Sequence, residues 1–294
     1  MAIRSMYVSK VSYPFYKEIH VELDWFGGFA LSQKRKCEIG LHKNFLSQYP
    51  KEKPLEISSA STNTLGKKLS AMNLKKQVII HDADKKLAAI SSVESVFQSS
   101  RIYVDGNNQI GPFPEYILSP GKESKKRVKE ASKGLHSYKY YYDGSYFFAP
   151  DYHISLFYDY VYMNALLEEE NKEAMLELLL GGYSAFSDLA TLALNSQARS
   201  CAIFVGLYKA GLLDMVRNKE SYLRLFRTKA NGEADLGAYE NVQLLKSDKV
   251  ELLSPIIPCI YHKDDVENIY LKKYSHLTNR KTDVSFVPYY LNKL

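Results

Sequence analysis

The sequence predicts an α+β fold with helices dominating its middle, and three observations support that prediction. Residues 17–24 (KEIHVELD) alternate apolar and polar side chains, as a half-buried strand does. Residues 151–180 carry apolar side chains at helical spacing and end at two consecutive glycines, so we expect one long helix there. The 294 residues are 46% hydrophobic and 24% charged, which is the composition of a globular chain.

The other elements follow from local signals along the chain. Gly27 and Gly28 form a turn, and Ser32 caps a helix that runs toward Leu46 and ends before Pro50. Further expected elements are short strands and loops over 51–74, a strand over 77–82, a helix from Ser91 or Ser92 to Tyr103, a loop over 105–120, a hairpin over 138–148 around Asp143-Gly144, and a helix from Asn195 or Ser196 to Val216.

The end of the chain differs in character from the rest. Residues 219–294 combine a basic helix-like piece (SYLRLFRTK), short strands and a tail rich in Tyr and Lys. We therefore expect residues 1–218 to form a single core and residues 219–294 to form a C-terminal extension packed on it.

Composition and motifs exclude several classes of protein. No stretch approaches the ~18 apolar residues of a membrane-spanning helix, and the N-terminus lacks the apolar core of a signal peptide. Three widely spaced cysteines make no disulfide framework, so we expect a cytoplasmic chain. The histidines and cysteines give no metal-ligand set, and the chain has no Gly-rich phosphate loop, so we expect no metal and no cofactor.

The net charge of +6 is concentrated in one window. Residues 122–133 hold six basic and two acidic side chains, a local charge of +4. Such a patch favours an anionic partner, and we take Lys125, Lys126, Arg127 and Lys129 as candidate nucleic-acid contacts. A solvated lysine-rich helix or loop explains the same window equally well.

Residues 91–103 (SSVESVFQSSRIY) form the first of three candidate site segments. On a helix, Glu94, Gln98 and Arg101 lie on one face, at i, i+4 and i+7. A plain solvated stripe would give the same spacing. The functional interpretation is a helix that lines a cleft, in which Glu94 is a general acid/base or a ribose ligand and Arg101 holds an anion.

The second segment is residues 194–207 (LNSQARSCAIFVGL). Asn195 or Ser196 caps a helix, yet Arg199 lies in the first turn, where the helix dipole disfavours a cation. That cation is explained either by an anion bound at the helix start or by a carboxylate from elsewhere, such as Asp159 or Asp188.

The third segment is residues 24–36 (DWFGGFALSQKRK), with Trp25 at a glycine turn and Lys34 at the following helix start. The only tryptophan of the chain can stack on a base or a ribose, although core packing is the commoner role of such a residue.

Together these segments resemble a known family. SVESVFQSSRIY resembles the S-V-E-x-x-F-Q-x-x-K-x-F signature of the NADAR superfamily. A larger set of motifs is most similar to the DarT-associated NADAR antitoxin family, collinearly over residues 25–213. These motifs are WFGGFALSQKRK, LEISSAS, LGKKLSAMNL, VESVFQSS, FYDYVYMNAL and NSQARSCAIFVGL.

The resemblance implies a NADAR-like core that binds ADP-ribose and removes it from guanine bases of nucleic acid by N-glycosidic hydrolysis, reversing a DarT-type toxin. By motif position, Glu94 would be the carboxylate at the ribose anomeric carbon, where positive charge develops. The ligand-binding residues implied are Trp25, Ser70, Asn73, Gln98, Asn195, Gln197 and Arg199.

Arg101 departs from the family motif, which has a lysine at this position as a covalent catalyst that forms a Schiff base. An arginine stays protonated and cannot supply a free amine. Arg127 likewise replaces an acidic position of the family. Two hypotheses follow: an active glycohydrolase whose amine has moved, for instance to Lys34 or Lys36, or an inactive NADAR protein that binds or sequesters ADP-ribose or a related nucleotide.

Overall fold

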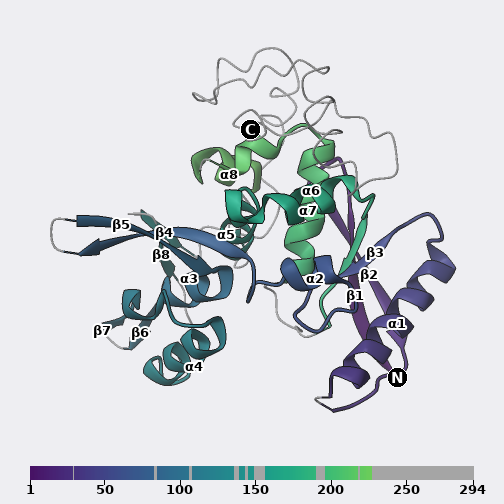
Figure 1. Ribbon diagram of the computed structural model, residues 1–294, viewed down its shortest axis with the longest axis horizontal. Coiled ribbons are helices and arrows are strands. Elements are labelled where there is room, and N and C mark those ends of the chain that lie inside the picture. The colour runs from purple at the N-terminus through teal and green to yellow at the C-terminus, as the bar shows by residue number, and fades with distance from the viewer. Residues whose placement is uncertain are drawn as a thin grey trace.

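The computed structural model describes residues 1–28, 30–82, 85–105, 108–135, 139–142, 145–148, 156–189, 196–217 and 219–226. Within these residues, a bundle of helices lies between two smaller parts (Figure 1). One part is a four-stranded sheet with a long helix beside it, and the other is a second sheet with two short helices. No helix in these ranges is long and apolar enough to cross a membrane.

The first part is a mixed sheet with one helix packed on it. Its elements are β1 (Ala2–Ser9), β2 (Tyr16–Leu23), α1 (Leu31–Gln48), β3 (Pro54–Glu56) and β10 (Ala185–Ser187). The strand order is β2-β1-β10-β3, with β1 antiparallel to both neighbours and β10 parallel to β3. Strand alternation turns Val21 and Leu23 to one face, where they pack in one cluster with Leu41 and Phe45 of α1.

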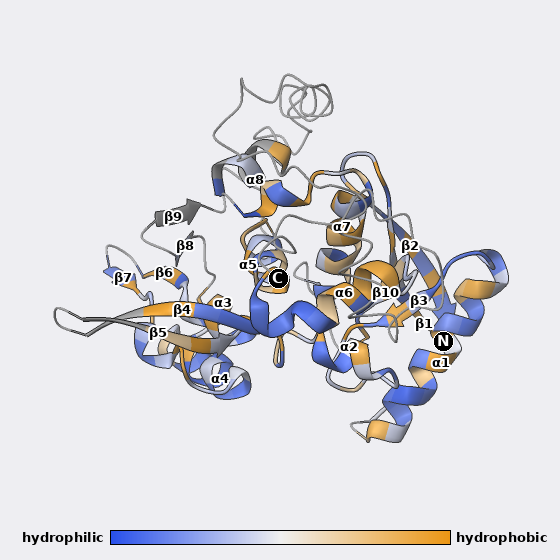
Figure 2. Cartoon of the chain, turned by 45° about the horizontal axis from the view of Figure 1, so that its top comes forward, coloured by the Kyte–Doolittle hydropathy of each residue, from blue (hydrophilic) through white to orange (hydrophobic). Residues whose placement is uncertain are grey.

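Three buried helices form the centre of the molecule. They are α5 (Leu156–Leu166), α6 (Lys172–Leu180) and α7 (Gln197–Lys209). Nearly all side chains of α5 and α7 are buried, so these helices are enclosed on every side, as core helices are. In Figure 2 hydrophobic residues gather on α6 and α7, whereas α1 is largely hydrophilic.

The second part joins a strand ribbon, a small sheet and two helices. Its elements are β4 (Lys75–Asp82), β5 (Lys85–Ser92), α3 (Val93–Ser99), β6 (Arg101–Asp105), β7 (Asn108–Ile110), α4 (Gly121–Ala131), β8 (Lys139–Tyr142) and β9 (Ser145–Phe148). β4 pairs with β5, and the second sheet has the order β7-β6-β8-β9. The Phe97 ring of α3 contacts Tyr140 of β8 and Phe157 of α5, which attaches this part to the central helices.

Short elements complete the described chain. They are α2 (Thr64–Lys68), η1 (Pro114–Tyr116), η2 (Glu169–Asn171), η3 (Leu213–Val216) and α8 (Lys219–Phe226). Tyr222 of α8 is buried, and its hydroxyl donates to the Leu156 carbonyl oxygen at 3.0 Å. α8, with which the compositionally distinct C-terminal region begins, therefore packs on the central helices.

The α+β prediction is confirmed, including the helix-rich centre. The strands near 17–24 and 77–82, the helix after the Gly27-Gly28 turn and the hairpin near 138–148 are all present. α4 shows that the basic window is a helix. Residues 2–9 and 85–92 form strands that their sequence pattern does not predict, and each is held by a paired neighbour.

Three helix predictions are wrong in extent. The described part of 151–180 contains two helices, because the Asn171 amide donates to the Ala165 carbonyl at 2.7 Å and to the Lys75 carbonyl at 2.6 Å, which fixes the break between α5 and α6. α3 ends at Ser99, so Arg101 begins a strand. α7 ends at Lys209, before a glycine with positive φ.

Gly206 of α7 generates a test of this packing. A Cβ there would lie 2.4 Å from the Lys10 carbonyl oxygen and 2.5 Å from the Phe15 carbonyl oxygen, both backbone atoms. We expect Gly206→Ala to lower the free energy of unfolding by about 1–3 kcal/mol in urea titrations. Gly40→Ala is the matched control, because Gly40 lies within α1 in open space, and it should raise stability by about 0.5–1 kcal/mol. An unchanged Gly206→Ala protein would contradict the close approach.

Candidate functional site

Glu94 lies at the centre of a row of polar contacts. The residue is buried, with 7% of its surface exposed. Gln98 Nε2 donates to Glu94 Oε1 at 3.0 Å, and Arg101 Nη1 donates to Gln98 Oε1 at 3.2 Å. Lys125 Nζ of α4 lies 3.9 Å from the same Glu94 oxygen. The structure thus brings the predicted carboxylate, amide and guanidinium together, and adds a lysine from the basic window.

A helix cap and one peptide group fix the backbone around Glu94. Ser92 caps α3 by accepting a hydrogen bond from Ser95 N at 3.1 Å. The Ala71 carbonyl accepts from Glu94 N at 2.9 Å, while Ala71 N donates to Gln197 Oε1 at 2.8 Å. The segment between α2 and β4 therefore ties the start of α3 to the start of α7.

Gly121, the first residue of α4, lies directly against Glu94. A Cβ at this position would be 3.0 Å from Glu94 Cβ and 2.9 Å from Met72 Sδ. The missing side chain lets the N-terminal end of α4 come close to the Glu94 side chain, and the helix dipole at that end favours negative charge. Lys125 follows one turn later on the same helix.

Arg101 is the first residue of β6, and its side chain still contacts Gln98 in the row of polar residues. Its guanidinium carbon lies 5.7 Å from the Phe97 ring centroid and 5.2 Å from that of Tyr103. Its Nε is buried and has no hydrogen-bond partner among the residues that the structure describes. Arg101 therefore holds an unused N–H donor next to Gln98.

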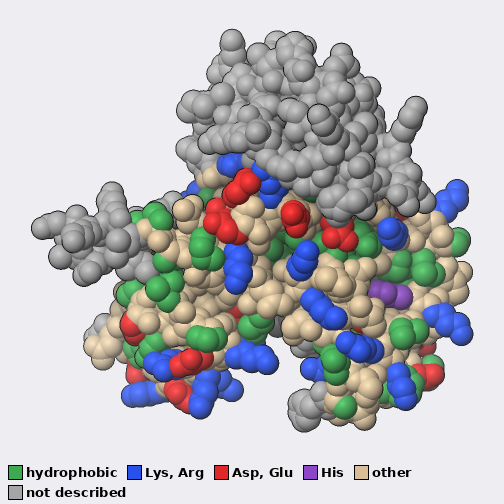
Figure 3. Space-filling view, viewed as in Figure 1, with side chains coloured by type: hydrophobic (Ala, Val, Ile, Leu, Met, Phe, Trp, Pro, Cys, Tyr) green, Lys and Arg blue, Asp and Glu red, His purple; other side chains and the backbone are tan. Residues whose placement is uncertain are grey.

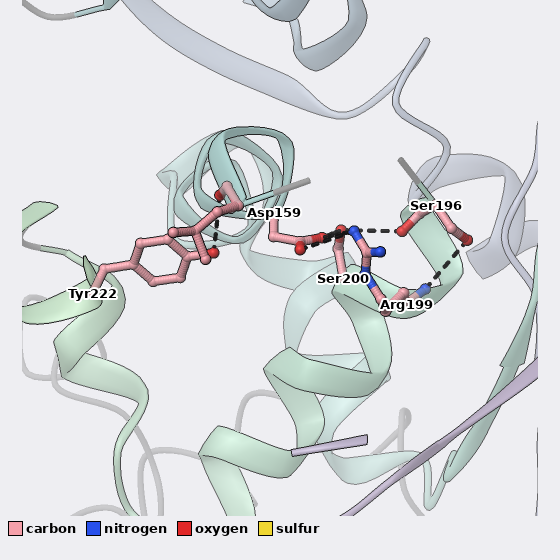
Figure 4. Close-up of polar contacts among 6 residues, drawn as sticks. Asp159, Ser196, Arg199, Ser200 and Tyr222 are labelled. Carbon is pink, nitrogen blue, oxygen red and sulfur yellow. Dashed lines mark hydrogen bonds and ion pairs between the residues drawn. The ribbon is translucent and has the colours of Figure 1, made fainter. Parts of the chain in front are cut away.

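Arg199 forms a buried ion pair with Asp159 (Figure 4). Arg199 Nη2 lies 3.1 and 3.0 Å from the two Asp159 carboxylate oxygens, and Ser200 Oγ donates to one of them at 2.7 Å. Ser196 caps α7 by accepting from Arg199 N. Burial alone would lower the pKa of Arg199, but the Asp159 charge leaves that pKa raised. Of the two explanations for a cation in this first turn, the structure shows the carboxylate.

Acidic side chains from several elements converge around Tyr158. Burial first, and then the charges of Glu94, Asp188 and Asp159, raise the pKa of the Tyr158 hydroxyl well above 10.0. Asp188, which follows β10, also raises the pKa of Glu56 in β3. Asp188 therefore interacts electrostatically with both Tyr158 and Glu56.

A cavity of about 240 Å³ lies beside α1 and the loop before it. Its walls include Trp25, Lys34 and Glu56. Trp25 is 41% exposed, and the Arg4 guanidinium lies over its ring at 4.1 Å. Trp25 and Lys34 thus share this cavity with a carboxylate, but the residue is Glu56, and Glu94 is not among the lining side chains.

Glu56 is a candidate site residue that no sequence motif had indicated. It is 2% exposed, and its carboxylate accepts from Ser187 Oγ at 2.5 Å and from Leu189 N at 3.0 Å. Burial first, and the Asp188 charge second, raise its pKa from 4.5 to about 7. Such a group can exchange a proton near neutral pH. The available signal was an acidic residue between the two apolar residues of LEI in the LEISSAS motif.

His42 of α1 supports Glu56 through Ser187. His42 Nε2 lies 3.0 Å from Ser187 Oγ, and burial lowers the pKa of His42 to about 4. His42 is therefore neutral at pH 7 and can donate to the serine oxygen while the serine hydroxyl donates to Glu56. This chain of contacts fixes the orientation of the carboxylate.

The other predicted ligand residues make local contacts. Ser70 is buried and accepts from Met72 N at 3.4 Å, and the exposed Asn73 donates to the Lys67 carbonyl at 2.8 Å. Asn195 lies outside the described residues. The ligand roles of Ser70 and Asn73 stay predictions.

α4 turns its basic side chains to solvent. Its buried residues are spaced three and four apart, so the opposite face is free to carry charge. Arg127 pairs with Glu123 and lies 5.5 Å from the Tyr116 ring centroid. Figure 3 shows the corner that carries α4 separated by a hollow from the part built on α1. The exposed basic residues are Lys122, Lys125, Lys126, Arg127 and Lys129.

Comparison with known proteins identifies one relevant family. The family model described as the DarT1-associated NADAR antitoxin matches residues 2–235. The match extends beyond residues 25–213, over which the motifs show the resemblance, and takes in β1 and α8. No curated protein matches the chain.

Glu56→Gln tests the raised pKa of this carboxyl. The pKa of the Glu56 carboxyl is about 7 in the folded chain, and its ordinary value is 4.5. Between these two pH values the folded state therefore binds more protons than the unfolded state. Stability is therefore lost as the pH rises from about 4.5 through 7, by up to about 3 kcal/mol. We expect Glu56→Gln to remove this loss, measured as unfolding free energy against pH.

A second pH-dependent contribution, from His42, is shared by both proteins. The lowered pKa of His42 costs stability as the pH falls from about 6.5 through 4, in wild type and variant alike. The difference between the two proteins therefore isolates Glu56. A difference that does not change with pH would show that Glu56 has an ordinary pKa.

Removal of one partner of the buried ion pair should be costly. We expect Asp159→Leu to lower the free energy of unfolding by about 3–5 kcal/mol, because it removes the counter-ion of the buried Arg199 guanidinium. Combining it with Arg199→Met should recover most of that loss in the same urea titration, since no charge is then buried. Additive losses in the double variant would contradict the pairing.

Proposed function

The chain belongs to the DarT1-associated NADAR antitoxin family, and on that premise we propose that it removes ADP-ribose from guanine bases of nucleic acid. The observation that carries the proposal is the buried Glu94 carboxylate, held by Gln98 at 3.0 Å with Lys125 Nζ at 3.9 Å. The reaction is hydrolysis of the N-glycosidic bond. The family description, a DarT1-associated antitoxin, supports a toxin of the DarT type as the partner. We propose that the chain reverses the modification that this toxin makes.

Glu94 would act at the ribose anomeric carbon. As the bond from this carbon to the base lengthens, positive charge develops on the sugar, and an adjacent carboxylate stabilises it. The effect is larger in a buried site than in water because the local dielectric is lower. Water adds its oxygen to the anomeric carbon and a proton ends on the base nitrogen, which gives free ADP-ribose and an unmodified base.

Lys125 supports the hydrolase over a protein that only binds. The family motif supplies an amine at the position of Arg101, and a guanidinium cannot replace it. Lys125 Nζ lies beside the Glu94 carboxylate, and its side chain is 63% exposed, so a ligand can reach it. We therefore propose Lys125, and not Lys34, as the amine of this site, because Lys34 lines the cavity at α1.

Arg101 favours a second candidate, a protein that binds ADP-ribose without cleaving it. Its buried and unused Nε donor is suited to a phosphate or carbonyl oxygen of a bound ligand. Glu94 would then accept hydrogen bonds from ribose hydroxyls. In both candidates the exposed lysines of α4 would contact the phosphate backbone of nucleic acid.

An oligonucleotide that carries ADP-ribosyl guanine separates the two candidates. We expect wild type to release free ADP-ribose, and Glu94→Gln to slow the release by roughly 10²–10⁴-fold, because the carboxylate is lost without change of shape. Lys125→Met should also slow release. Lys43→Met is the matched control, since Lys43 is exposed on α1, and it should leave the rate unchanged.

Other outcomes assign the chain differently. Tight binding of the oligonucleotide without release, together with release gained by Arg101→Lys, would identify the binding protein. Neither binding nor release by wild type would contradict both candidates.

A further inference from the structure

The side-chain amide of Gln98 is held at both ends. Gln98 is buried, and its two amide atoms face two different charged groups. A guanidinium has only donors, so the Gln98 oxygen must face Arg101, whose Nη1 donates to it at 3.2 Å. The NH2 group at the other end donates to Glu94 Oε1 at 3.0 Å. Arg101 therefore anchors the end of the amide that lies away from Glu94.

The guanidinium of Arg101 is itself held in place. Its carbon lies 5.2 Å from the ring centroid of Tyr103 and 5.7 Å from that of Phe97, and a cation is attracted to such rings. Burial raises the pKa of Tyr103, and the nearby Arg101 charge opposes that rise. The Arg101 backbone is fixed as well, because it pairs with Tyr140 of β8. A guanidinium that is already ordered loses little further freedom when it binds Gln98.

The two oxygens of the Glu94 carboxylate have different surroundings. Oε1 accepts from Gln98, and Lys125 Nζ lies 3.9 Å from the same oxygen. Among the residues that the structure describes, none makes a hydrogen bond or an ion pair with Oε2. The Glu94 side chain is 10% exposed, so a ligand can reach it. One oxygen is thus held by the protein and the other is left for a ligand.

We infer that Arg101 is a positioning residue, which acts through Gln98 to hold Glu94 Oε1 and so leaves Oε2 to face the ribose. The inference rests on the proposed function, because it assigns the working oxygen of that site. It also gives a role to the guanidinium at the position where the family motif has an amine, since a donor is kept there while the nucleophile is lost.

The orientation of Glu94 matters because the carboxylate must be in place before charge develops on the sugar. A misplacement of about 1 Å can cost about 10²-fold in rate. A positioning residue therefore changes kcat, whereas a residue that contacts the bound ligand in the ground state changes KM. This difference separates the role inferred for Arg101 from a direct contact with ADP-ribose.

Single and double variants, assayed on the oligonucleotide that carries ADP-ribosyl guanine, test the inference. We expect Arg101→Met, which keeps the apolar stem, to lower kcat by about 10–100-fold and to leave KM within about twofold. Gln98→Leu should lower kcat as well. The double variant should be about as slow as Gln98→Leu alone, because Arg101 acts only through Gln98.

Arg217→Met is the matched control. Arg217 is an exposed arginine that pairs with Asp214, and neither residue contacts the row at Glu94. This variant should change neither kcat nor KM.

Hydrogen exchange of the Gln98 side-chain amide measures the contact without catalysis. The NMR signal of this amide is identified by its loss in Gln98→Leu. We expect Arg101→Met to speed exchange of its protons with water by at least about tenfold, because the amide then leaves Glu94 more often. Arg217→Met should leave the exchange rate unchanged.

The outcomes separate this inference from the proposed function. Three results would each overturn the inference even if wild type releases ADP-ribose: a raised KM with unchanged kcat in Arg101→Met, losses in kcat that multiply in the double variant, or an unchanged exchange rate in Arg101→Met. If wild type releases no ADP-ribose, the proposed function fails, and the exchange rates still decide whether Arg101 orients Gln98.

Discussion

The buried ion pair between Asp159 and Arg199 is the contact on which the rest of the structure depends. It removes two charges from water, which costs several kcal/mol for each ion unless geometry and hydrogen bonds compensate. Here the Arg199 nitrogen lies about equally far from both carboxylate oxygens, and the Ser200 hydroxyl adds a third hydrogen bond. The pair therefore fixes α5 and α7 side by side, and an apolar replacement of one partner alone would leave the other charge buried without this counter-ion.

The pair also helps to position Glu94, because one peptide group, that of Ala71, connects the start of α7 to the start of α3. The first turn of α7 presents Gln197 to the N–H of Ala71, and the Ala71 carbonyl accepts the backbone N–H of Glu94. The start of α4 then approaches so closely that a side chain at position 121 would crowd Glu94 and Met72. A carboxylate that acts on a developing charge must be held before the reaction begins, and these contacts supply that rigidity.

Two buried carboxylates lie in different surroundings. Glu94 is contacted by an amide and an amine, whereas Glu56 lies beside Asp188 and a serine in complete burial. On the proposed function, Glu94 would act on the glycosidic bond.

The local elements of the fold could be predicted because local sequence determines them. The Ser92 and Ser196 caps, the amphipathic α3 and the hairpin of β8 and β9 depend on spacing within a few residues. The one long helix over 151–180 could not be resolved into two, because the break is made by the Asn171 side chain and the distant Lys75 carbonyl.

The sequence by itself determined the family, the α+β class and the contact of Glu94 with Gln98, which are one helical turn apart. Only the tertiary structure decided that Lys125 lies beside Glu94, that Asp159 is the partner of Arg199, and that Glu56 borders a cavity with Trp25. Each of these joins residues from separate elements, and neither their spacing nor their composition encodes the distance. The raised pKa of Glu56 belongs to the same class, because burial is a property of the folded chain and not of the residue.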